Sequence, residues 1–269
     1  MRVHMGKTIV VGLAALALAL TSCSSSKGGK GGGGGGGNNV DTSGTKGTGI
    51  FADCGKSAND CNSGKVKKGG TLTYTVEKTI VGWNTNSSNS STFDLVEIED
   101  GLIGGAFTAN PDLKPALNTD MMTSAEQTKA DPQTLVYKIK PEAVWSDGTP
   151  ITEKDFEYQL HTSDGTSCPD CAPASTSGYD QVASIAGSDN DKTVTVVMKK
   201  PYSDWQSMFG ALYPAHILGQ HGDVATPKGL AASFAWSDKT QPTYSNGPYM
   251  ISAADKETSV TLVPNPKWY

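Results

Sequence analysis

A segment of low complexity between residues 23 and 68 limits which part of this 269-residue chain can fold. Gly, Ser, Asn and Lys dominate the segment, and Gly31–Gly37 form an unbroken run. Such a composition has too few large apolar side chains to offset the conformational entropy that is lost when a chain becomes ordered. We therefore predict a flexible linker over residues 23–68 and a folded domain over residues 69–269.

Residues 1–22 have the layout of an export signal. Arg2 and Lys7 lie near the start, and the apolar run from Thr8 to Leu20 is too short to span a bilayer as a helix. The run ends in Leu-Thr-Ser-Cys, which resembles the bacterial lipobox, and an ordinary secretory signal with a chance cysteine is the alternative. We predict a signal peptide over residues 1–22 and lipidation of Cys23. The protein would then be extracytoplasmic, in the periplasmic space, and anchored to the outer face of the cell membrane.

The charge of the chain argues against nucleic acid as a partner. The formal net charge is −5, and Arg2 is the one arginine. Loss of the signal removes Arg2 and Lys7 and no acidic residue, so the remaining chain is more acidic still. A protein without guanidinium groups lacks the bidentate readers of phosphates and base edges, and we therefore exclude DNA and RNA as partners.

Two pairs of cysteines are separated by short spacings. In an oxidising compartment Cys54 and Cys61 most simply close a small loop through a disulfide. Cys168 and Cys171 form a Cys-Pro-Asp-Cys motif, which fits a disulfide, a redox pair or half of a zinc site. No second Cys-x-x-Cys or nearby His-x-x-His accompanies the motif. We therefore predict disulfides between Cys54 and Cys61 and between Cys168 and Cys171, and no metal ligands.

From residue 69 onward the pattern becomes that of a globular protein with helices and strands. Alternating apolar and polar residues predict strands, and amphipathic periodicity after a capping residue predicts helices. The expected strands are residues 71–76, 134–140, 192–198 and 259–263, and the expected helices are residues 94–103 and 152–160. Thr152, which is followed by acidic residues, begins the second helix. The mixture predicts an α/β fold with a mixed sheet and flanking helices.

Four stretches, read in order along residues 69–269, resemble a known family. The most specific is residues 144–156, Val-Trp-Ser-Asp-Gly-Thr-Pro-Ile-Thr-Glu-Lys-Asp-Phe, in which an Asp-Gly turn precedes a helix that Thr152 caps. The others are Gly-Gly-Thr-Leu at 69–72, Tyr-Pro-Ala-His-Ile-Leu at 213–218, and Ser-Asn-Gly-Pro-Tyr-Met-Ile at 245–251 with the Asn-Pro-Lys-Trp-Tyr ending. Together they are similar to the bacterial extracellular solute-binding proteins of family 5, which bind oligopeptides, dipeptides or nickel.

The resemblance implies a class II periplasmic-binding-protein-like fold, represented by its first lobe and a peripheral subdomain. It also implies that the protein captures a peptide or similar small solute and delivers it to the permease subunits of an ABC importer, without a cofactor. Family members are usually much longer, so we expect this chain to be an N-terminal fragment. The Cys-Pro-Asp-Cys insertion departs from the family pattern. A surface receptor that senses peptides without transporting them is the alternative function.

Five residues are candidate ligand contacts. Trp83 and Asn84 follow the first expected strand, where Trp could form a flat apolar wall and Asn could both donate to and accept from the amides of a peptide. Burial in the core is the competing interpretation for Trp83. Asn246, Gly247 and Tyr249 belong to the fourth family-like stretch, where a turn with a packed ring is the competing interpretation.

Signatures of catalysis are missing from the sequence. It contains neither Gly-x-Ser-x-Gly nor His-Glu-x-x-His, and the five-residue spacing of His216 and His221 keeps them off a common helical face. We expect no enzymatic activity and no metal site.

Overall fold

The computed structural model describes residues 69–109 and 114–269, which belong to one compact unit. The predicted signal peptide (1–22), the linker (23–68), the lipidation site Cys23 and the Cys54–Cys61 pair lie outside the described residues. Within the described part of the chain, no helix is long and apolar enough to cross a bilayer.

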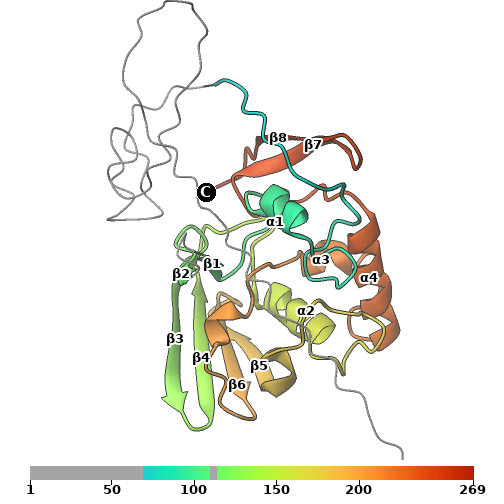
Figure 1. The fold of residues 1–269 in the computed structure, drawn as a ribbon. Coiled ribbons are helices and arrows are strands. Elements are labelled where there is room, and N and C mark those ends of the chain that lie inside the picture. Colours follow the sequence, from blue (N-terminus) through green and yellow to red (C-terminus); the bar gives the residue numbers. More distant parts are fainter. Residues whose placement is uncertain (1–68, 110–113) are drawn as a thin grey trace, which may run out of the picture. The chain divides into compact units, whose positions relative to one another are not determined.

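An antiparallel sheet of four strands in the order β3-β4-β6-β5 is the largest sheet of the described chain (Figure 1). Its strands are β3 (Met122–Ala130), β4 (Gln133–Ile139), β5 (Val182–Ser188) and β6 (Thr193–Met198). Tyr137 of β4 lies opposite Val194 of β6, and both are fully buried. The alternation that predicted strands at 134–140 and 192–198 therefore reflects one buried face.

Helix α2 (Glu153–Ser163) packs beside this sheet and begins where its capping residues predict. Thr152 accepts a hydrogen bond from the backbone of Lys154, and the Asp155 carboxylate accepts one from the backbone N–H of Thr152, which completes a capping box. The turn before the helix is also as predicted, because Gly148 has a φ of +89°, a left-handed conformation that glycine adopts without a steric penalty. The helix and the turn expected from the sequence are confirmed.

The remaining elements lie before, between and after these five along the sequence. They are α1 (Phe93–Glu99), β1 (Phe107–Ala109), β2 (Pro115–Leu117), η2 (Tyr179–Gln181), η3 (Trp205–Ser207), α3 (Ala215–Leu218), α4 (Pro227–Lys239), β7 (Tyr249–Asp255) and β8 (Ser259–Pro264). Strands β1 and β2 form one antiparallel pair, and β7 and β8 form another. The β8 strand expected at 259–263 is confirmed. All strand pairings within the described residues are antiparallel, so the expectation of a sheet that mixes parallel and antiparallel strands was wrong for this part of the chain.

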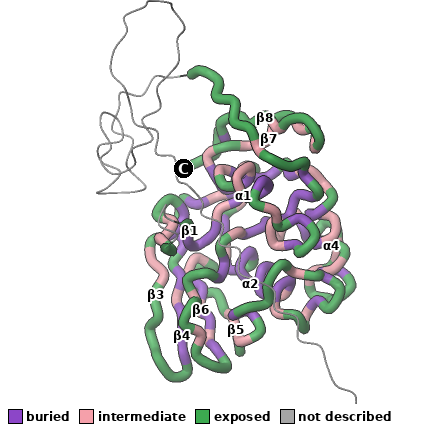
Figure 2. The backbone as a smooth tube through the Cα atoms, viewed as in Figure 1, coloured by how far each residue is buried: buried purple, intermediate pink, exposed green. Residues whose placement is uncertain are grey.

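Two apolar clusters hold these elements together. Figure 2 shows where along the chain the residues are buried. The larger cluster runs from the sheet through α2 to α4 and includes Trp145, Phe156 and Phe209, which are all fully buried. The smaller one consists of Ile80, Trp83 and Leu95, with side chains of β7 and β8 packed against it. Helix α1 and the β7–β8 pair therefore share a core with the segment that precedes Asn84.

One expectation for the N-terminal part of the domain was wrong, and the helix expected at 94–103 is present but ends earlier. Residues 71–76 form no strand, and Leu72 and Tyr74 are 90% and 68% exposed. An alternating segment becomes a strand only when a neighbouring strand pairs with its backbone, and none does so in the described part of the chain. Helix α1 ends at Glu99 rather than 103, because the chain turns at Gly101 and buries Leu102 and Ile103 as a loop.

Candidate ligand-binding site

The segment from Ser245 to Tyr249 crosses the loop that follows α1 and is hydrogen-bonded to it along its length. The Asn246 side chain forms two hydrogen bonds with the backbone of Gly104. Its Oδ1 accepts from the Gly104 N–H at 2.6 Å, and its Nδ2 donates to the Gly104 carbonyl at 3.0 Å. The backbone N–H groups of Asn246 and Gly247 both donate to the carbonyl of Leu102, at 3.0 and 3.2 Å. The polar groups of this crossing are therefore occupied within the protein.

Gly247 is required at the crossing by the close approach of two backbones. A Cβ atom placed on Gly247 would lie 2.4 Å from the carbonyl oxygen of Gly101, well inside van der Waals contact. Tyr249, at the start of β7, donates its backbone N–H to that same carbonyl, and its ring lies against Gly101. The tyrosine side chain nevertheless stays 46% exposed, so a ligand can reach it.

Residues 84–90 form a polar loop, called the Asn84 loop here, which is hydrogen-bonded to several other segments of the chain. Asn84 is 1% exposed, donates from Nδ2 to Ser237 Oγ at 2.8 Å, and accepts from the backbone of Asn86. Asn86 in turn donates to the side chain of Gln159 and to the carbonyl of Ala211. Both polar ends of the Asn84 side chain are thus satisfied within the protein.

Trp83 is 2% exposed and belongs to the smaller apolar cluster. Its backbone N–H donates to the carbonyl of Asp238 at the end of α4, and Lys256 Nζ lies 5.7 Å from the centre of its ring. At that distance the ammonium group can interact with the π face. In this arrangement Trp83 is a core residue.

Glu99 is a buried acidic residue next to the Asn84 loop, and it was not predicted from the sequence as a notable residue. Tyr213 donates to Glu99 Oε2 at 3.0 Å, and its hydroxyl oxygen accepts the backbone N–H of Thr85 at 2.9 Å. Burial raises the pKa of Glu99 to about 8, although the hydrogen bond from Tyr213 lowers it. Among the described residues, the other oxygen of Glu99 and the hydroxyl of nearby Tyr244 have no hydrogen-bond partner. Tyr213 opens the Tyr-Pro-Ala-His-Ile-Leu stretch, but nothing in the sequence pointed to its partner.

The structure separates the five sequence-predicted contacts into two groups. Asn246, Gly247 and Tyr249 lie together on the loop after α1, whereas Trp83 and Asn84 lie against the end of α4. The smaller apolar cluster connects the groups, because Ile251 of β7 packs against it. Of the five residues, Tyr249 alone exposes much of its surface, and a ligand contact by any of them stays a prediction.

A cavity of about 760 Å³ lies elsewhere, between α2, α3 and the start of α4. Its lining residues include Pro150, Tyr158 and Leu230, together with His161 and His216. None of the five predicted contacts lines it. His216 contacts Asp147, with 2.8 Å between His216 Nε2 and Asp147 Oδ2. The described residues contain no group of three or more His, Cys, Asp or Glu side chains that could hold a metal ion.

A protein family and several known proteins match this chain. The family model for the bacterial extracellular solute-binding proteins, family 5 (middle region), matches residues 116–269. Oligopeptide-binding protein OppA of Mycobacterium tuberculosis (strain ATCC 25618 / H37Rv) is 38% identical over 168 residues, which are 61% of this chain and 27% of that protein. The chain thus spans little more than a quarter of the length of this relative.

Solved structures agree with this assignment. The structure of a periplasmic EDTA-binding protein, EppA, is similar with a TM-score of 0.73 and 39% identity, over 77% of this chain and 38% of that one. Haemophilus influenzae OppA in complex with the peptide RPPGFSPFR has a TM-score of 0.56 at 18% identity, over 71% of this chain and 37% of that one, which shows a shared fold. The predicted α/β, class II periplasmic-binding-protein-like fold is confirmed. The chain belongs to family 5 of the bacterial extracellular solute-binding proteins.

Proposed function

We propose that the protein is the extracytoplasmic solute-binding component of an ABC importer and that it captures peptides or similar small solutes for the permease subunits. The observation that carries the proposal is the family match over residues 116–269, in which the turn and capped helix at 144–156 fold as one architectural unit. The peptide named in the OppA structure and the name of the mycobacterial relative support a peptide ligand.

The second ligand class to test is a small polycarboxylate, because EppA is described as EDTA-binding. A peptide and a chelate make different demands on a site: a peptide requires groups that pair with its amides, and a polycarboxylate requires cations. The described chain has no arginine, the side chain that pairs with carboxylates through two parallel hydrogen bonds. This distribution of groups favours the peptide.

Exposed apolar side chains on β7, β8 and the segment after them would form part of the contact surface. Besides Tyr249 they are Leu262, Val263 and Trp268, which are 37%, 40% and 44% exposed. Aromatic and aliphatic walls suit peptides of varied sequence, since such walls do not select a particular side chain. The hydrogen bonds to the peptide backbone would come from polar groups that are not already paired.

Anchoring by Cys23 after removal of residues 1–22 is the second part of the proposal. The layout Leu-Thr-Ser-Cys after an apolar run supports it, and residues 23–68 would form a flexible tether. A tethered binding protein stays close to the permease that it serves while the folded domain moves.

The experiment is a thermal-shift screen of the full-length gene product against di- to hexapeptides, nickel chelates and EDTA. A ligand at 100 times its Kd should stabilise the protein by about 2.7 kcal/mol, a rise in Tm of several degrees. We expect peptides to produce this shift. A shift with EDTA or a nickel chelate alone would replace the peptide by a chelate, and no shift with any compound would contradict the proposal.

A pair of variants locates the contact surface. Tyr249→Ala should reduce the peptide-induced shift, whereas Phe93→Ala, which truncates a 75% exposed ring on α1, should leave it unchanged. Equal effects of the two variants would argue against a contact by Tyr249.

A further inference from the structure

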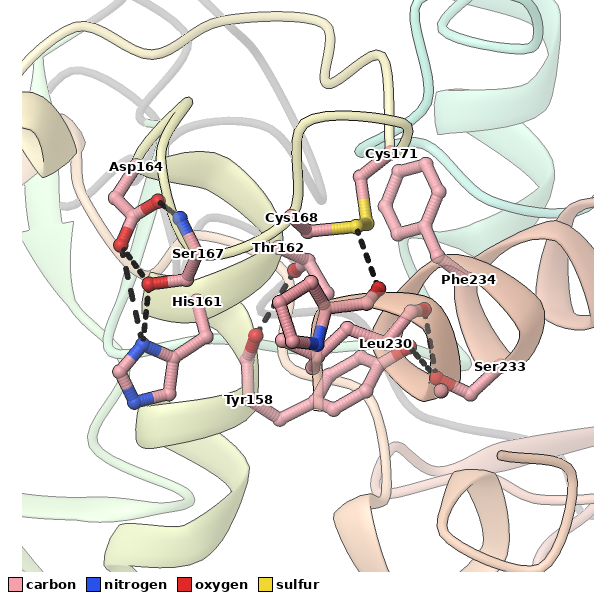
Figure 3. The surroundings of a disulfide bond; sticks show 12 residues. Tyr158, His161, Thr162, Asp164, Ser167, Cys168, Cys171, Leu230, Ser233 and Phe234 are labelled. Carbon is pink, nitrogen blue, oxygen red and sulfur yellow. Dashed lines mark hydrogen bonds and ion pairs between the residues drawn. A yellow bond between two sulfur atoms is a disulfide. The ribbon is translucent and has the colours of Figure 1, made fainter. Parts of the chain in front are cut away.

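The Cys-Pro-Asp-Cys loop is fixed at its start by α2 and at its centre by a disulfide. The Asp164 carboxylate, which follows α2, accepts hydrogen bonds from the backbones of Thr166 and Ser167 at 2.7 Å each. Cys168 and Cys171 are joined as a disulfide and are 1% and 3% exposed (Figure 3). Because both cysteines are buried in the larger core cluster, the disulfide packs against other parts of the fold and not only across a surface turn.

The disulfide lies on helix α4. Cys168 Sγ is 3.9 Å from the carbonyl of Pro227 in the first turn of that helix, and Figure 3 shows the Phe234 ring beside Cys171. Near the end of the same helix, Ser237 Oγ accepts a hydrogen bond from Nδ2 of Asn84, the first residue of the Asn84 loop, at 2.8 Å. The loop and the disulfide therefore share a supporting helix.

The chain leaving the disulfide pairs directly with the Asn84 loop. Ser88 donates its backbone N–H to the carbonyl of Ala172 at 3.0 Å, and Ala174 donates to the carbonyl of Asn86 at 2.8 Å. Ser87 and Pro173 form an antiparallel bridge between these bonds. Residues 172–174 thus act as a short partner strand for residues 86–88.

The conformation of this partner strand needs support from its surroundings. Ala172 has a φ of +47°, in the left-handed region that residues with a Cβ atom rarely adopt. Ala172 follows Cys171 directly, so the disulfide fixes the backbone immediately before the strained residue. Without that constraint, the chain at 172 would be free to relax to an ordinary conformation, and the carbonyl would turn away from Ser88.

We propose that the Cys168–Cys171 disulfide is a positioning element of the ligand site: it holds residues 172–174 in place, and through them the backbone of the Asn84 loop. The ligand part of this inference rests on the proposed function. A preorganised loop binds more tightly because less conformational entropy is lost on binding.

The test measures amide hydrogen exchange in the full-length, ligand-free protein and in the double variant Cys168→Ala/Cys171→Ala. Alanine is chosen because it adds no polar group to the buried position. The reporter is the amide of Ser88, which is far from the cysteines in sequence and bonds to Ala172. We expect its exchange to become at least tenfold faster, while the amides of β4 keep their protection. Asp170→Asn, an exposed change between the cysteines that leaves the disulfide intact, is the matched control.

Two results would overturn the proposal. Unchanged exchange at Ser88 would show that the Asn84 loop does not depend on the disulfide. Faster exchange spread equally over β4 and α2, or a double variant that unfolds as a whole, would show that the disulfide stabilises the domain without positioning the loop in particular.

Ligand binding is measured separately. With a peptide that binds the unmodified protein, the double variant should raise Kd several-fold and Asp170→Asn should not. If the unmodified protein binds no peptide, the peptide part of the proposed function fails, while the exchange result still decides the role of the disulfide. An unchanged Kd together with faster exchange at Ser88 would show that the disulfide positions the Asn84 loop but does not affect ligand binding.

Discussion

Tyr213 and Glu99 form a buried pair in which the phenol donates to the carboxyl group at 3.0 Å. The same hydroxyl oxygen accepts from the backbone of Thr85, so the pair joins the end of α1 to the Asn84 loop. Within the part of the chain that the structure describes, one oxygen of Glu99 has no hydrogen-bond partner, and no cation is among the interactions that shift its pKa. A carboxyl group in such a setting is held in its neutral form, because ionisation would leave an uncompensated buried charge.

Because the pKa of Glu99 is raised in the folded state, we predict that the free energy of unfolding falls as the pH rises. Its pKa is raised from 4.5 to about 8, so the folded state binds one more proton than the unfolded state between these values. The stabilising contribution is complete below pH 4.5 and is lost as the pH rises to 8, by roughly 1 kcal/mol per pH unit. Urea denaturation from pH 5 to 8.5 measures this loss.

Glu99→Gln supplies the control, because glutamine keeps the shape of the side chain and does not titrate. The variant should remove the fall in stability between pH 6 and 8. Burial also raises the pKa of Asp155 to about 6, so a smaller pH dependence should persist below pH 6 in the variant. Identical pH profiles of the two proteins between pH 6 and 8 would show that Glu99 is ionised in the fold.

Tyr213→Phe removes the hydroxyl that serves both Thr85 and Glu99. The backbone N–H of Thr85 loses its acceptor and Glu99 loses its donor, and leaving buried polar groups unpaired costs about 1–3 kcal/mol. The free energy of unfolding at pH 6, obtained by urea denaturation, should fall by that amount. Tyr249→Phe removes a hydroxyl from a 46% exposed ring and should change stability by less than about 0.5 kcal/mol. Equal losses in the two variants would contradict the structural role of Tyr213.

Elements with local signals could be predicted from the sequence. Thr152 and Asp155 form their capping box within one helical turn, and Gly148 provides the turn before it, so three neighbouring positions specify the start of α2. Strands β4 and β6 alternate because one face is buried. The start of α2 depends on neighbouring residues alone, which is why a pattern of a few residues was sufficient there. Strands β4 and β6 carry the local alternation of a strand, but they also need each other as pairing partners.

Features that depend on distant contacts could not be predicted. Residues 71–76 alternate like a strand but lack a partner strand in the described chain, and the partner of Tyr213, Glu99, lies 114 residues away in sequence. The polar character of Asn84 and Asn246 suggested ligand contacts, yet their side chains bond to Ser237 and Gly104. A polar residue in a loop looks the same in sequence whether it faces a ligand or another segment of the same chain.

Gly247→Ala tests the backbone crossing at the candidate site. The added methyl group would lie 2.4 Å from the carbonyl oxygen of Gly101, so two hydrogen-bonded segments must move apart. Such overpacking typically costs about 1–3 kcal/mol. Gly210→Ala is the control, since its added Cβ would meet nothing closer than 4.0 Å and should be nearly neutral. Thermal or urea unfolding of both variants checks the difference, and a neutral Gly247→Ala would refute the close approach.

Cys23→Ala tests the predicted anchor independently of the ligand. An acyl chain stabilises membrane association by about 0.8 kcal/mol for each buried CH₂ group, and a lipobox cysteine carries more than one chain, so the unmodified protein should stay with the membrane fraction. The variant has no thiol to acylate at this position, and we expect it to lose incorporation of labelled palmitate and to leave the membrane fraction. Cys54→Ala, in the same low-complexity segment, is the matched control and should retain both properties. Palmitate labelling that persists in Cys23→Ala would locate the acyl group elsewhere, and a loss in both variants would point to an indirect effect on export.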